Sequence, residues 1–285
     1  MALSIGIVGA GTMGAGIAHV AALSKCHVAL YDINEEIIRR SIERINFEMK
    51  KSVDKSKISE DDMKQAMNRI KKRTNINDLD TCDIIIEAVL EDVRVKKDLF
   101  KKLDQMAHHT TILATTTSSL SITTLAAATK RPERVIGTHF FNPVHTIQLV
   151  EVVRGLLTSS DVVNRTLDAI KAIGKTPISV KDSPGFVVNR VSSLLFSEAM
   201  KLVNDGVASI ELIDNIVKNS GGLKIGPFEK MDDIGNDVHF AVMQAMYEQL
   251  YHEPRFRPST LQKQLVEAGL FGKKEKKGFY NYEEK

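Results

Sequence analysis

A glycine-rich turn set between two short apolar runs limits the fold of this chain more than any other feature. Residues 3–8 and residues 27–31 are apolar runs of strand length, and residues 15–23 between them have helical spacing. A strand, a helix and a second strand within about 30 residues predict a βαβ unit. Such a unit places its strands parallel in one sheet and makes a right-handed connection between them.

The turn has the sequence Gly9-Ala10-Gly11-Thr12-Met13-Gly14, which matches the GxGxxG spacing. We expect Gly9 to make the tight turn, Gly11 to let the backbone approach a pyrophosphate, and Gly14 to let the helix pack closely on the strand. The helix N-terminus then offers unpaired N–H groups and the positive end of its dipole to the anion. The motif, with Thr12 and Met13 included, is therefore predicted to bind a dinucleotide.

One acidic residue narrows the choice of dinucleotide. Asp32 lies 18 residues beyond Gly14, at the end of the second predicted strand. A carboxylate at this place accepts hydrogen bonds from the adenosine ribose hydroxyl groups, and it repels a 2′-phosphate. The spacing predicts NAD rather than NADP as the cofactor.

The rest of the chain divides into two parts of different character. Further strands are expected at residues 83–88, 111–114, 135–139, 149–153 and 177–180, and helices at residues 35–50, 60–72, 93–106 and 161–173. Ser59 followed by Asp62 is typical of a capping box at the start of one helix. Beyond Asp182-Ser183-Pro184-Gly185 the apolar spacing is helical, with no strand pattern before residues 278–280. The sequence thus predicts an α/β fold, with a Rossmann-type, mostly parallel sheet in residues 1–183 and a second, all-α domain in residues 184–285.

Composition excludes several classes of protein. The 285 residues carry a net charge of +3 and are 43% hydrophobic, as expected for a globular chain of about two domains. The two cysteines, Cys26 and Cys82, form no CxxC pair, which excludes a zinc ribbon or a disulfide scaffold, and no metal site is predicted. No apolar run is long enough for a membrane helix, and no basic residue precedes Lys25, so we expect a cytoplasmic protein with no membrane partner.

A basic stretch raises the alternative of nucleic-acid binding. Residues 39–73 hold twelve basic and six acidic side chains. A platform for stacking bases needs aromatic side chains, and Phe47 is the single one in this stretch. We interpret the stretch as a solvated helical face and predict no nucleic-acid partner.

A histidine and a glutamate are the first candidates for catalysis. His139 ends the strand predicted at residues 135–139, and ligands gather at the carboxyl ends of strands in open α/β sheets. Glu151 lies inside the next predicted strand, where an unpaired charge is costly. A His–Glu pair fixes the imidazole tautomer and stabilises its protonated form, as general acid–base work near neutral pH requires. Position alone leaves a structural histidine as the alternative.

Seven further motifs follow the glycine turn in a characteristic order. They are Glu87-Ala88-Val89, Thr117-Ser118-Ser119-Leu120, His139-Phe140-Phe141-Asn142-Pro143, Leu149-Val150-Glu151-Val152, Asp182-Ser183-Pro184-Gly185-Phe186-Val187-Val188-Asn189-Arg190, Gly226-Pro227-Phe228-Glu229 and Lys277-Gly278-Phe279-Tyr280. Together with the turn, they resemble the L-3-hydroxyacyl-CoA dehydrogenase family over nearly the full chain. The resemblance implies NAD-dependent hydride transfer between 3-hydroxyacyl-CoA and 3-oxoacyl-CoA thioesters, here (S)-3-hydroxybutyryl-CoA and acetoacetyl-CoA.

The resemblance also implies roles for individual residues. His139 would be the general base that removes the 3-hydroxyl proton, and Glu151 would orient it and balance its charge. Ser118 and Asn189 would hold the substrate for in-line transfer. Contacts to NAD are implied for Glu91, Lys96, Ser118, Asn142 and Lys274, and contacts to CoA for Lys51, Lys55 and Ser118. The helical domain would close the substrate cleft and form a homodimer.

Simpler alternatives stay open for several of these residues. Asn189 could make a core hydrogen bond, and Ser118 could be a generic turn hydroxyl. Lys51 and Lys55 could be ordinary surface lysines. Glu91 and Lys96 could be a surface ion pair.

The chain also departs from the family pattern. Thr115-Thr116-Thr117 stands where Ser-Asn-Thr is usual, so an amide is missing from this loop, and His145 stands where a small or apolar residue is usual.

Two other functions remain to be distinguished. One is a dehydrogenase of a free hydroxy acid or sugar acid, which would leave Lys51 and Lys55 without a role. The other is a catalytically silent NAD-binding protein, against which the presence of His139 and Glu151 counts.

Overall fold

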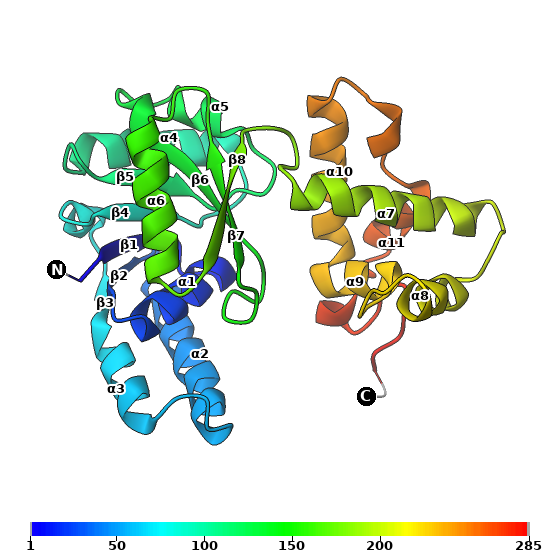
Figure 1. The fold of residues 1–285 in the computed structure, drawn as a ribbon, viewed down its shortest axis with the longest axis horizontal. Helices are drawn as coiled ribbons and strands as arrows, with labels where there is room; N and C mark the ends of the chain where they lie inside the picture. Colours follow the sequence, from blue (N-terminus) through cyan, green and yellow to red (C-terminus); the bar gives the residue numbers. More distant parts are fainter. Residues whose placement is uncertain (1, 284–285) are drawn as a thin grey trace. The chain divides into compact units, whose positions relative to one another are not determined.

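The computed structural model describes residues 2–283, and the chain divides into two compact units, Met1–Asp182 and Ser183–Lys285 (Figure 1). The first unit is α/β and the second is helical, so the predicted fold class is confirmed. None of the helices in residues 2–283 has both the length and the apolar character that crossing a bilayer requires.

One sheet forms the centre of the first unit. Its eight strands lie in the order β3-β2-β1-β4-β5-β6-β7-β8. Their bounds are β1 Ser4–Val8, β2 His27–Tyr31, β3 Ile70–Arg73, β4 Ile84–Glu87, β5 Ile112–Thr115, β6 Val135–Phe140, β7 Leu149–Arg154 and β8 Thr176–Lys181. β6 and β7 pair antiparallel, and the other neighbours pair parallel. The strand order changes direction between β1 and β4, which is where open α/β sheets bind ligands.

Within residues 2–182 the first unit has six α-helices. They are α1 Thr12–Leu23, α2 Glu35–Asp54, α3 Glu60–Arg69, α4 Val93–Met106, α5 Ile122–Ala126 and α6 Ser160–Ala172. α1 packs against α2 and α3, whereas α6 packs against β7 and β8. Strands such as β4 are buried at every position, as expected for parallel strands covered on both faces.

Some predicted boundaries in the first unit are wrong. The helix expected at residues 60–72 ends at Arg69, and Ile70–Arg73 forms β3 at the edge of the sheet. Within β3 only Ile70 is buried, and three basic residues follow it, so no apolar alternation marks the strand in the sequence. Charged side chains are typical of edge strands, where they discourage pairing with other chains. The predicted capping box of Ser59 and Asp62 is confirmed.

In residues 183–283 the second unit is a bundle of five α-helices around its own core. They are α7 Val188–Asn204, α8 Ile210–Asn219, α9 Pro227–Ile234, α10 Asn236–Gln249 and α11 Thr260–Glu267. The core includes Phe196, Met200, Phe228 and Met231.

The segment that follows α11 is held by two buried carboxylates. Residues 278–280, where the sequence suggested a strand, form no strand. Instead the backbone N–H groups of Phe279 and Tyr280 each donate to Asp232 at 3.0 Å. The hydroxyl of Tyr282 donates to Asp232 at 3.0 Å, and that of Tyr280 donates to Asp214 at 2.8 Å. Asp232 and Asp214 therefore anchor this segment on α9 and α8.

Candidate active site

The glycine turn lies at the switch point of the sheet, between the carboxyl ends of β1 and β4. Gly9 has a φ of +102°, and a Cβ there would lie 2.5 Å from the carbonyl oxygen of Ala88. A Cβ on Gly14 would lie 1.8 Å from the carbonyl oxygen of Gly9. Both positions therefore require glycine, for the tight turn and for the close approach of α1 to β1.

Gly11 differs from the other two glycines because a Cβ on it would meet nothing within 4 Å. Packing does not explain this glycine, whereas the approach of a ligand to the backbone would. Gly11 is also the N-cap of α1, and it supplies no side-chain hydrogen bond to the first turn. The N–H groups at this helix end are therefore oriented toward a site that suits a pyrophosphate.

An arginine that the sequence did not single out lies against this turn. Arg44, on α2, donates from Nη2 to the carbonyl oxygen of Gly11 at 2.8 Å and from Nη1 to Oγ1 of Thr12 at 3.2 Å. It belongs to the basic stretch that we interpreted as a solvated face. Its partners are more than 30 residues away in the chain, so no local spacing marks it.

Asp32 joins the end of β2 to the glycine turn. Its Oδ2 accepts a hydrogen bond from the N–H of Ala10 at 2.8 Å, and its Oδ1 accepts one from the N–H of Asn34 at 3.1 Å. A carboxylate oxygen accepts more than one hydrogen bond, so both oxygens retain capacity for ribose hydroxyl groups. The half-buried side chain thus fits the predicted role, which stays a prediction.

His139 and Glu151 are brought into contact by the antiparallel pairing of β6 and β7. The two residues are direct register partners, and Nδ1 of His139 lies 2.7 Å from Oε2 of Glu151. Glu151 is fully buried, and His139 is 5% exposed. A buried carboxylate accepts a hydrogen bond from Nδ1–H, which leaves Nε2 as the basic nitrogen of the neutral ring. This geometry is what a general acid–base pair requires.

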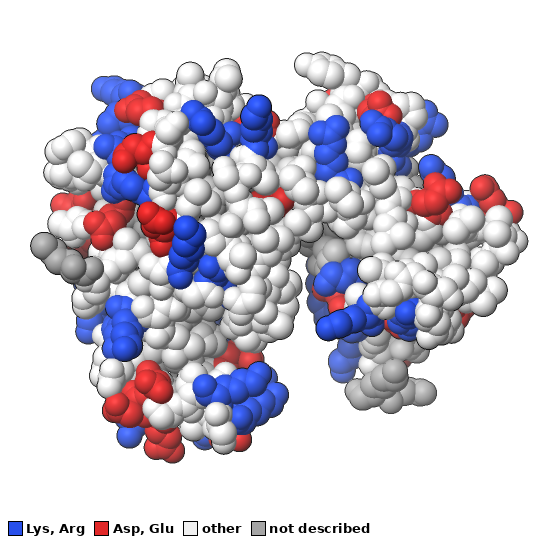
Figure 2. Space-filling view, in the orientation of Figure 1, with Lys and Arg blue, Asp and Glu red and all other residues white. Residues whose placement is uncertain are grey.

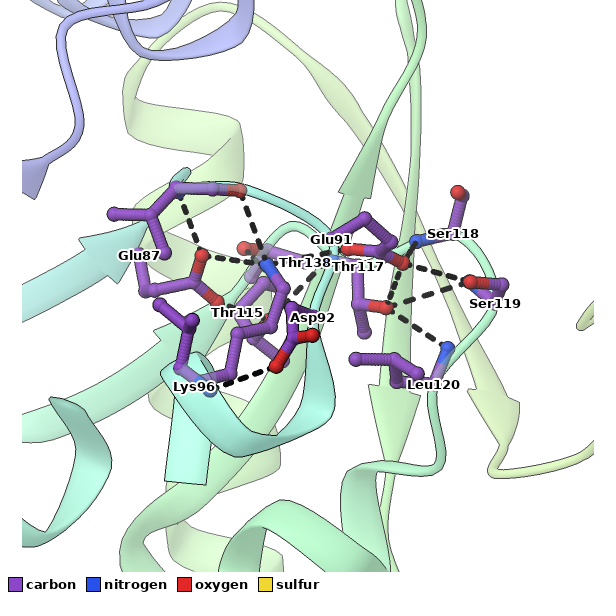
Figure 3. Close-up of polar contacts among 12 residues, drawn as sticks. Glu87, Glu91, Asp92, Lys96, Thr115, Thr117, Ser118, Ser119, Leu120 and Thr138 are labelled. Carbon is purple, nitrogen blue, oxygen red and sulfur yellow. Dashed lines mark hydrogen bonds and ion pairs between the residues drawn. The ribbon is translucent and has the colours of Figure 1, made fainter. Parts of the chain in front are cut away.

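Glu91, Lys96 and Ser118 form one polar cluster between the loops after β4 and β5 (Figure 3). Nζ of Lys96 lies 2.6 Å from Oε1 of Glu87 and 3.2 Å from Oε2 of Glu91. The backbone N–H of Ser118 donates to Oε1 of Glu91 at 3.1 Å. The ion pair between Glu91 and Lys96 is present, but Lys96 is 1% exposed and Glu91 is 36% exposed, so the pair is buried on its lysine side. Contacts of these residues to NAD stay a prediction.

A cavity of about 350 Å³ lies between α1, α2 and the loop that follows β6. Thr12 and Asn142, two predicted cofactor contacts, line it together with Glu48 and His145. The rings of His145 and His19 stack there with their centroids 5.6 Å apart.

The two predicted CoA contacts lie at the C-terminal end of α2. Nζ of Lys51 lies 3.0 Å from Oε1 of Glu48, which lines the cavity. Lys55 is exposed at the C-cap of α2. Figure 2 shows Lys and Arg side chains gathered over this end of the helix. A basic surface beside a cavity suits a ligand that carries phosphate groups.

Asn189 and Lys274 belong to the second unit. Asn189 is half-buried in the first turn of α7, and its side-chain amide makes no hydrogen bond within residues 2–283. No core hydrogen bond of Asn189 is seen among these residues, and its role in substrate binding stays a prediction. Nζ of Lys274 lies 2.6 Å from Oδ2 of Asp237.

Comparison with known families decides the class of this site. The family model described as 3-hydroxyacyl-CoA dehydrogenase, NAD binding domain, matches residues 4–183, and 3-hydroxyacyl-CoA dehydrogenase, C-terminal domain, matches residues 185–282. The chain belongs to the 3-hydroxyacyl-CoA dehydrogenase family. It is an NAD-dependent dehydrogenase, and the open position at Gly11 and the uncapped end of α1 fit that cofactor.

Individual members of the 3-hydroxyacyl-CoA dehydrogenase family are similar over the whole chain. The probable 3-hydroxybutyryl-CoA dehydrogenase of Bacillus subtilis (strain 168) is 41% identical, over 98% of this chain and 97% of that protein. The crystal structure of (S)-3-hydroxybutyryl-CoA dehydrogenase from Ralstonia eutropha has a TM-score of 0.95 and 40% identity, with both chains fully covered. The 3-hydroxyadipyl-CoA dehydrogenase of Escherichia coli (strain K12) is 41% identical, but this chain spans 59% of its length.

Proposed function

We propose that this dehydrogenase interconverts (S)-3-hydroxybutyryl-CoA and acetoacetyl-CoA, with His139 and Glu151 as its general acid–base pair. The observation that carries the proposal is the 2.7 Å contact between the imidazole and a fully buried carboxylate. His139 lies near the carboxyl end of β6, and the glycine turn follows the carboxyl end of β1 in the same sheet. Two similar proteins named above act, by their names, on 3-hydroxybutyryl-CoA. The name of the Escherichia coli relative shows that related chains also take a longer, charged acyl group.

The proton in this reaction is handled by His139. NAD, when bound, supplies the acceptor for the hydride that leaves C3 of the hydroxyacyl group. As the hydride leaves, Nε2 of His139 takes the proton of the 3-hydroxyl group, so the C–O bond becomes a carbonyl. The imidazole becomes cationic in this step, and the carboxylate of Glu151 balances the new charge. In reduction the same nitrogen returns the proton to the 3-oxygen.

Ser118 and Asn189 are assigned to substrate binding in this proposal. The amide of Asn189 has donors that it does not use within residues 2–283, and Ser118 lies on the loop at the carboxyl end of β5. Hydrogen bonds from such donors to the 3-oxygen or the thioester would hold C3 in line for transfer. Lys51 and Lys55 would bind the phosphate groups of CoA.

A homodimer through the second unit is part of the proposal. Val191, Leu194 and Leu195 on α7 and Leu212 and Ile216 on α8 are apolar side chains exposed to solvent. Such a concentration on two consecutive helices is typical of a surface that binds another protein. A second copy of the chain would bury this apolar surface.

A cytoplasmic location also stays a prediction, which fractionation of the host cells would test.

Loss of NADH absorbance with acetoacetyl-CoA tests the proposed reaction. We expect turnover with acetoacetyl-CoA and none with free acetoacetate, because the free acid lacks the phosphate groups that Lys51 and Lys55 would bind. Turnover of the free acid at a similar kcat/KM would favour the hydroxy-acid alternative. Binding of NADH without turnover of any 3-oxoacyl-CoA would favour the catalytically silent alternative.

A further inference from the structure

The carboxylate of Glu87 is fully buried at the end of β4, and it is not among the residues that carry the proposed function. Its Oε1 accepts hydrogen bonds from Nζ of Lys96 at 2.6 Å and from the N–H of Val89 at 2.7 Å. Its Oε2 accepts one from Oγ1 of Thr115 at 2.7 Å. Burying a carboxylate is costly unless it is paired and hydrogen-bonded, and both conditions are met here.

Lys96 links Glu87 to a second carboxylate. Its ammonium group is buried and lies 3.2 Å from Oε2 of Glu91, on the side of the cluster that faces the 115–119 loop (Figure 3). Burial alone would raise the pKa of the Glu91 carboxyl group, but the charge of Lys96 and hydrogen bonds from Thr117 and Ser119 outweigh it and hold that pKa below its usual value. Glu91 is therefore an anion at neutral pH, and it accepts hydrogen bonds at full strength.

Glu91 holds the tip of the loop that carries Ser118. Its Oε1 accepts hydrogen bonds from the N–H groups of Ser118 and Ser119, at 3.1 and 3.2 Å, and from Oγ of Ser119 at 2.8 Å. The hydroxyl of Thr117 donates to the same oxygen. One carboxylate oxygen thus gathers several donors from three consecutive residues.

The start of this loop contacts Glu87 directly, and its tip is connected to Glu87 through Lys96 and Glu91. At its start, the side chain of Glu87 binds the hydroxyl of Thr115, and its backbone carbonyl accepts the N–H of Thr116 at 2.9 Å. At the tip, Glu87 acts through Lys96 and Glu91. Thr116 stands where the family pattern has an asparagine, so the loop lacks that amide.

We propose that Glu87 is a positioning residue, which fixes Ser118 through Thr115 at the start of the loop and through Lys96 and Glu91 at its tip. The inference rests on the proposed function for the role of Ser118 in catalysis. It does not rest on that function for the position of the loop. A purely structural role would lower the stability of the whole unit and leave this loop no more mobile than its surroundings.

Hydrogen exchange of the free protein tests the position of the loop without any substrate. In Glu87→Gln, amides of residues 116–120 should exchange about tenfold faster, the equivalent of one lost hydrogen bond to a charged group. The matched control is Asp104→Asn, since Asp104 is also buried in this unit and bonds Arg131 at 2.7 Å and the N–H of Lys130 at 2.7 Å. In the control, exchange at residues 116–120 should match the wild type. Unchanged exchange in Glu87→Gln, or an equal increase in the control, would overturn the proposal.

A milder variant covers the case in which Glu87→Gln does not fold. Thr115→Val removes one hydroxyl and no charge. It cuts the direct bond between Glu87 and the loop, and it also removes the acceptor of the Thr117 N–H. Exchange at residue 116 and at residues 118–120 should rise about tenfold, as for one lost hydrogen bond to a charged group, and residue 117 is left out because its N–H loses its own acceptor. Exchange as slow as in the wild type would overturn the proposal in this variant as well.

A kinetic cycle with Ser118→Ala tests whether Glu87 acts through Ser118. Glu87→Gln should lower kcat/KM for acetoacetyl-CoA about tenfold in the wild type and less than about threefold in Ser118→Ala, because the serine hydroxyl is already absent. Losses that multiply in the double variant would overturn the action through Ser118. If the wild type does not turn over acetoacetyl-CoA, the proposed function fails, and the exchange result still decides the role of Glu87.

Discussion

Nδ1 of His139 and Oε2 of Glu151 lie 2.7 Å apart, across the antiparallel β6–β7 pair in which the two residues are register partners. The strand pairing therefore holds the imidazole and the carboxylate together before any ligand arrives. Because Glu151 is fully buried, its charge depends on nearby donors for compensation. We expect the two side chains to act as one unit.

Kinetics of the pair test this expectation. His139→Gln should retain NADH binding and lose about 10²–10⁴-fold in kcat, the usual contribution of general acid–base catalysis. Glu151→Gln should also lower kcat, since an amide can bond the imidazole but cannot balance its charge. The double variant should be little worse than His139→Gln alone. Losses that multiply would mean that the two residues contribute separately.

Cofactor preference should depend on Asp32. Asp32→Ser should weaken NADH and improve NADPH, because one carboxylate supplies both the ribose hydrogen bonds and the repulsion of a 2′-phosphate. Asp32→Asn is a second variant, which keeps an acceptor for the N–H of Ala10 and removes the charge. The ratio of kcat/KM for NADH and NADPH should fall in both variants. A wild type that prefers NADPH would contradict this assignment.

Recognition of CoA should be electrostatic. Lys51→Ala with Lys55→Ala should raise KM for acetoacetyl-CoA roughly threefold to tenfold, as expected for two exposed charge contacts, and leave KM for NADH unchanged. Added salt should reduce the difference. Lys101→Ala is the matched control, because Lys101 is exposed and pairs with Asp98 as Lys51 pairs with Glu48. If the double variant and Lys101→Ala change KM for acetoacetyl-CoA equally, Lys51 and Lys55 are ordinary surface lysines.

Light scattering should detect the proposed dimer and its interface. Val191→Lys with Ile216→Lys places two charges on the exposed apolar face of α7 and α8, and it should halve the measured mass. Leu156→Lys alters another highly exposed apolar residue, in the first unit, and should leave the mass unchanged. A monomeric wild type, or a double variant that remains a dimer, would exclude this face.

Stability should fall in mild acid because of a buried histidine. Burial lowers the pKa of His239 to about 4 from an ordinary value of 6.5, and a hydrogen bond with Gln262 opposes the shift. Between these values the unfolded chain binds more protons than the folded chain. The contribution of His239 to the free energy of unfolding should thus be fully present above pH 6.5. It should decrease as the pH falls toward 4, by up to about 3 kcal/mol.

Urea unfolding at several pH values measures this contribution. His239→Phe cannot titrate and should have a smaller dependence on pH than the wild type. His27→Gln, at an exposed position, should retain the wild-type dependence. Equal dependence in wild type and His239→Phe would show that His239 is not the group responsible. His19, whose pKa burial and the neighbouring His145 also lower to about 4, should contribute in the same direction.

Local spacing was enough to predict the centre of the fold. The glycine turn and its flanking runs require a βαβ unit, because turn, helix period and strand length all agree within one short segment. The edge strand β3 could not be found this way. Its three basic residues suit an edge strand, which is exposed to solvent. They show no alternation of apolar and polar residues, which is the pattern that would mark a strand in the sequence.

The site was predicted where partners lie near each other along the chain. His139 and Glu151 are twelve residues apart on consecutive strands, and the cost of a charge within a strand indicates a partner. The same argument applies to Glu87, which ends the apolar strand β4, and it would have found that residue too. Arg44 has no such signal, because only the packing of α2 against α1 brings it to the glycine turn.

The carboxylates of Asp214 and Asp232 have a consequence for the order in which the chain matures on the ribosome. Both are buried, and residues 279–282 supply hydrogen bonds to each of them. These residues are synthesised after helices α7 to α11, so the helical unit reaches its final hydrogen bonding only after residue 282 has emerged. The strands β1 to β8 need nothing from this segment for their pairing, and they can assemble while the helices are still being made.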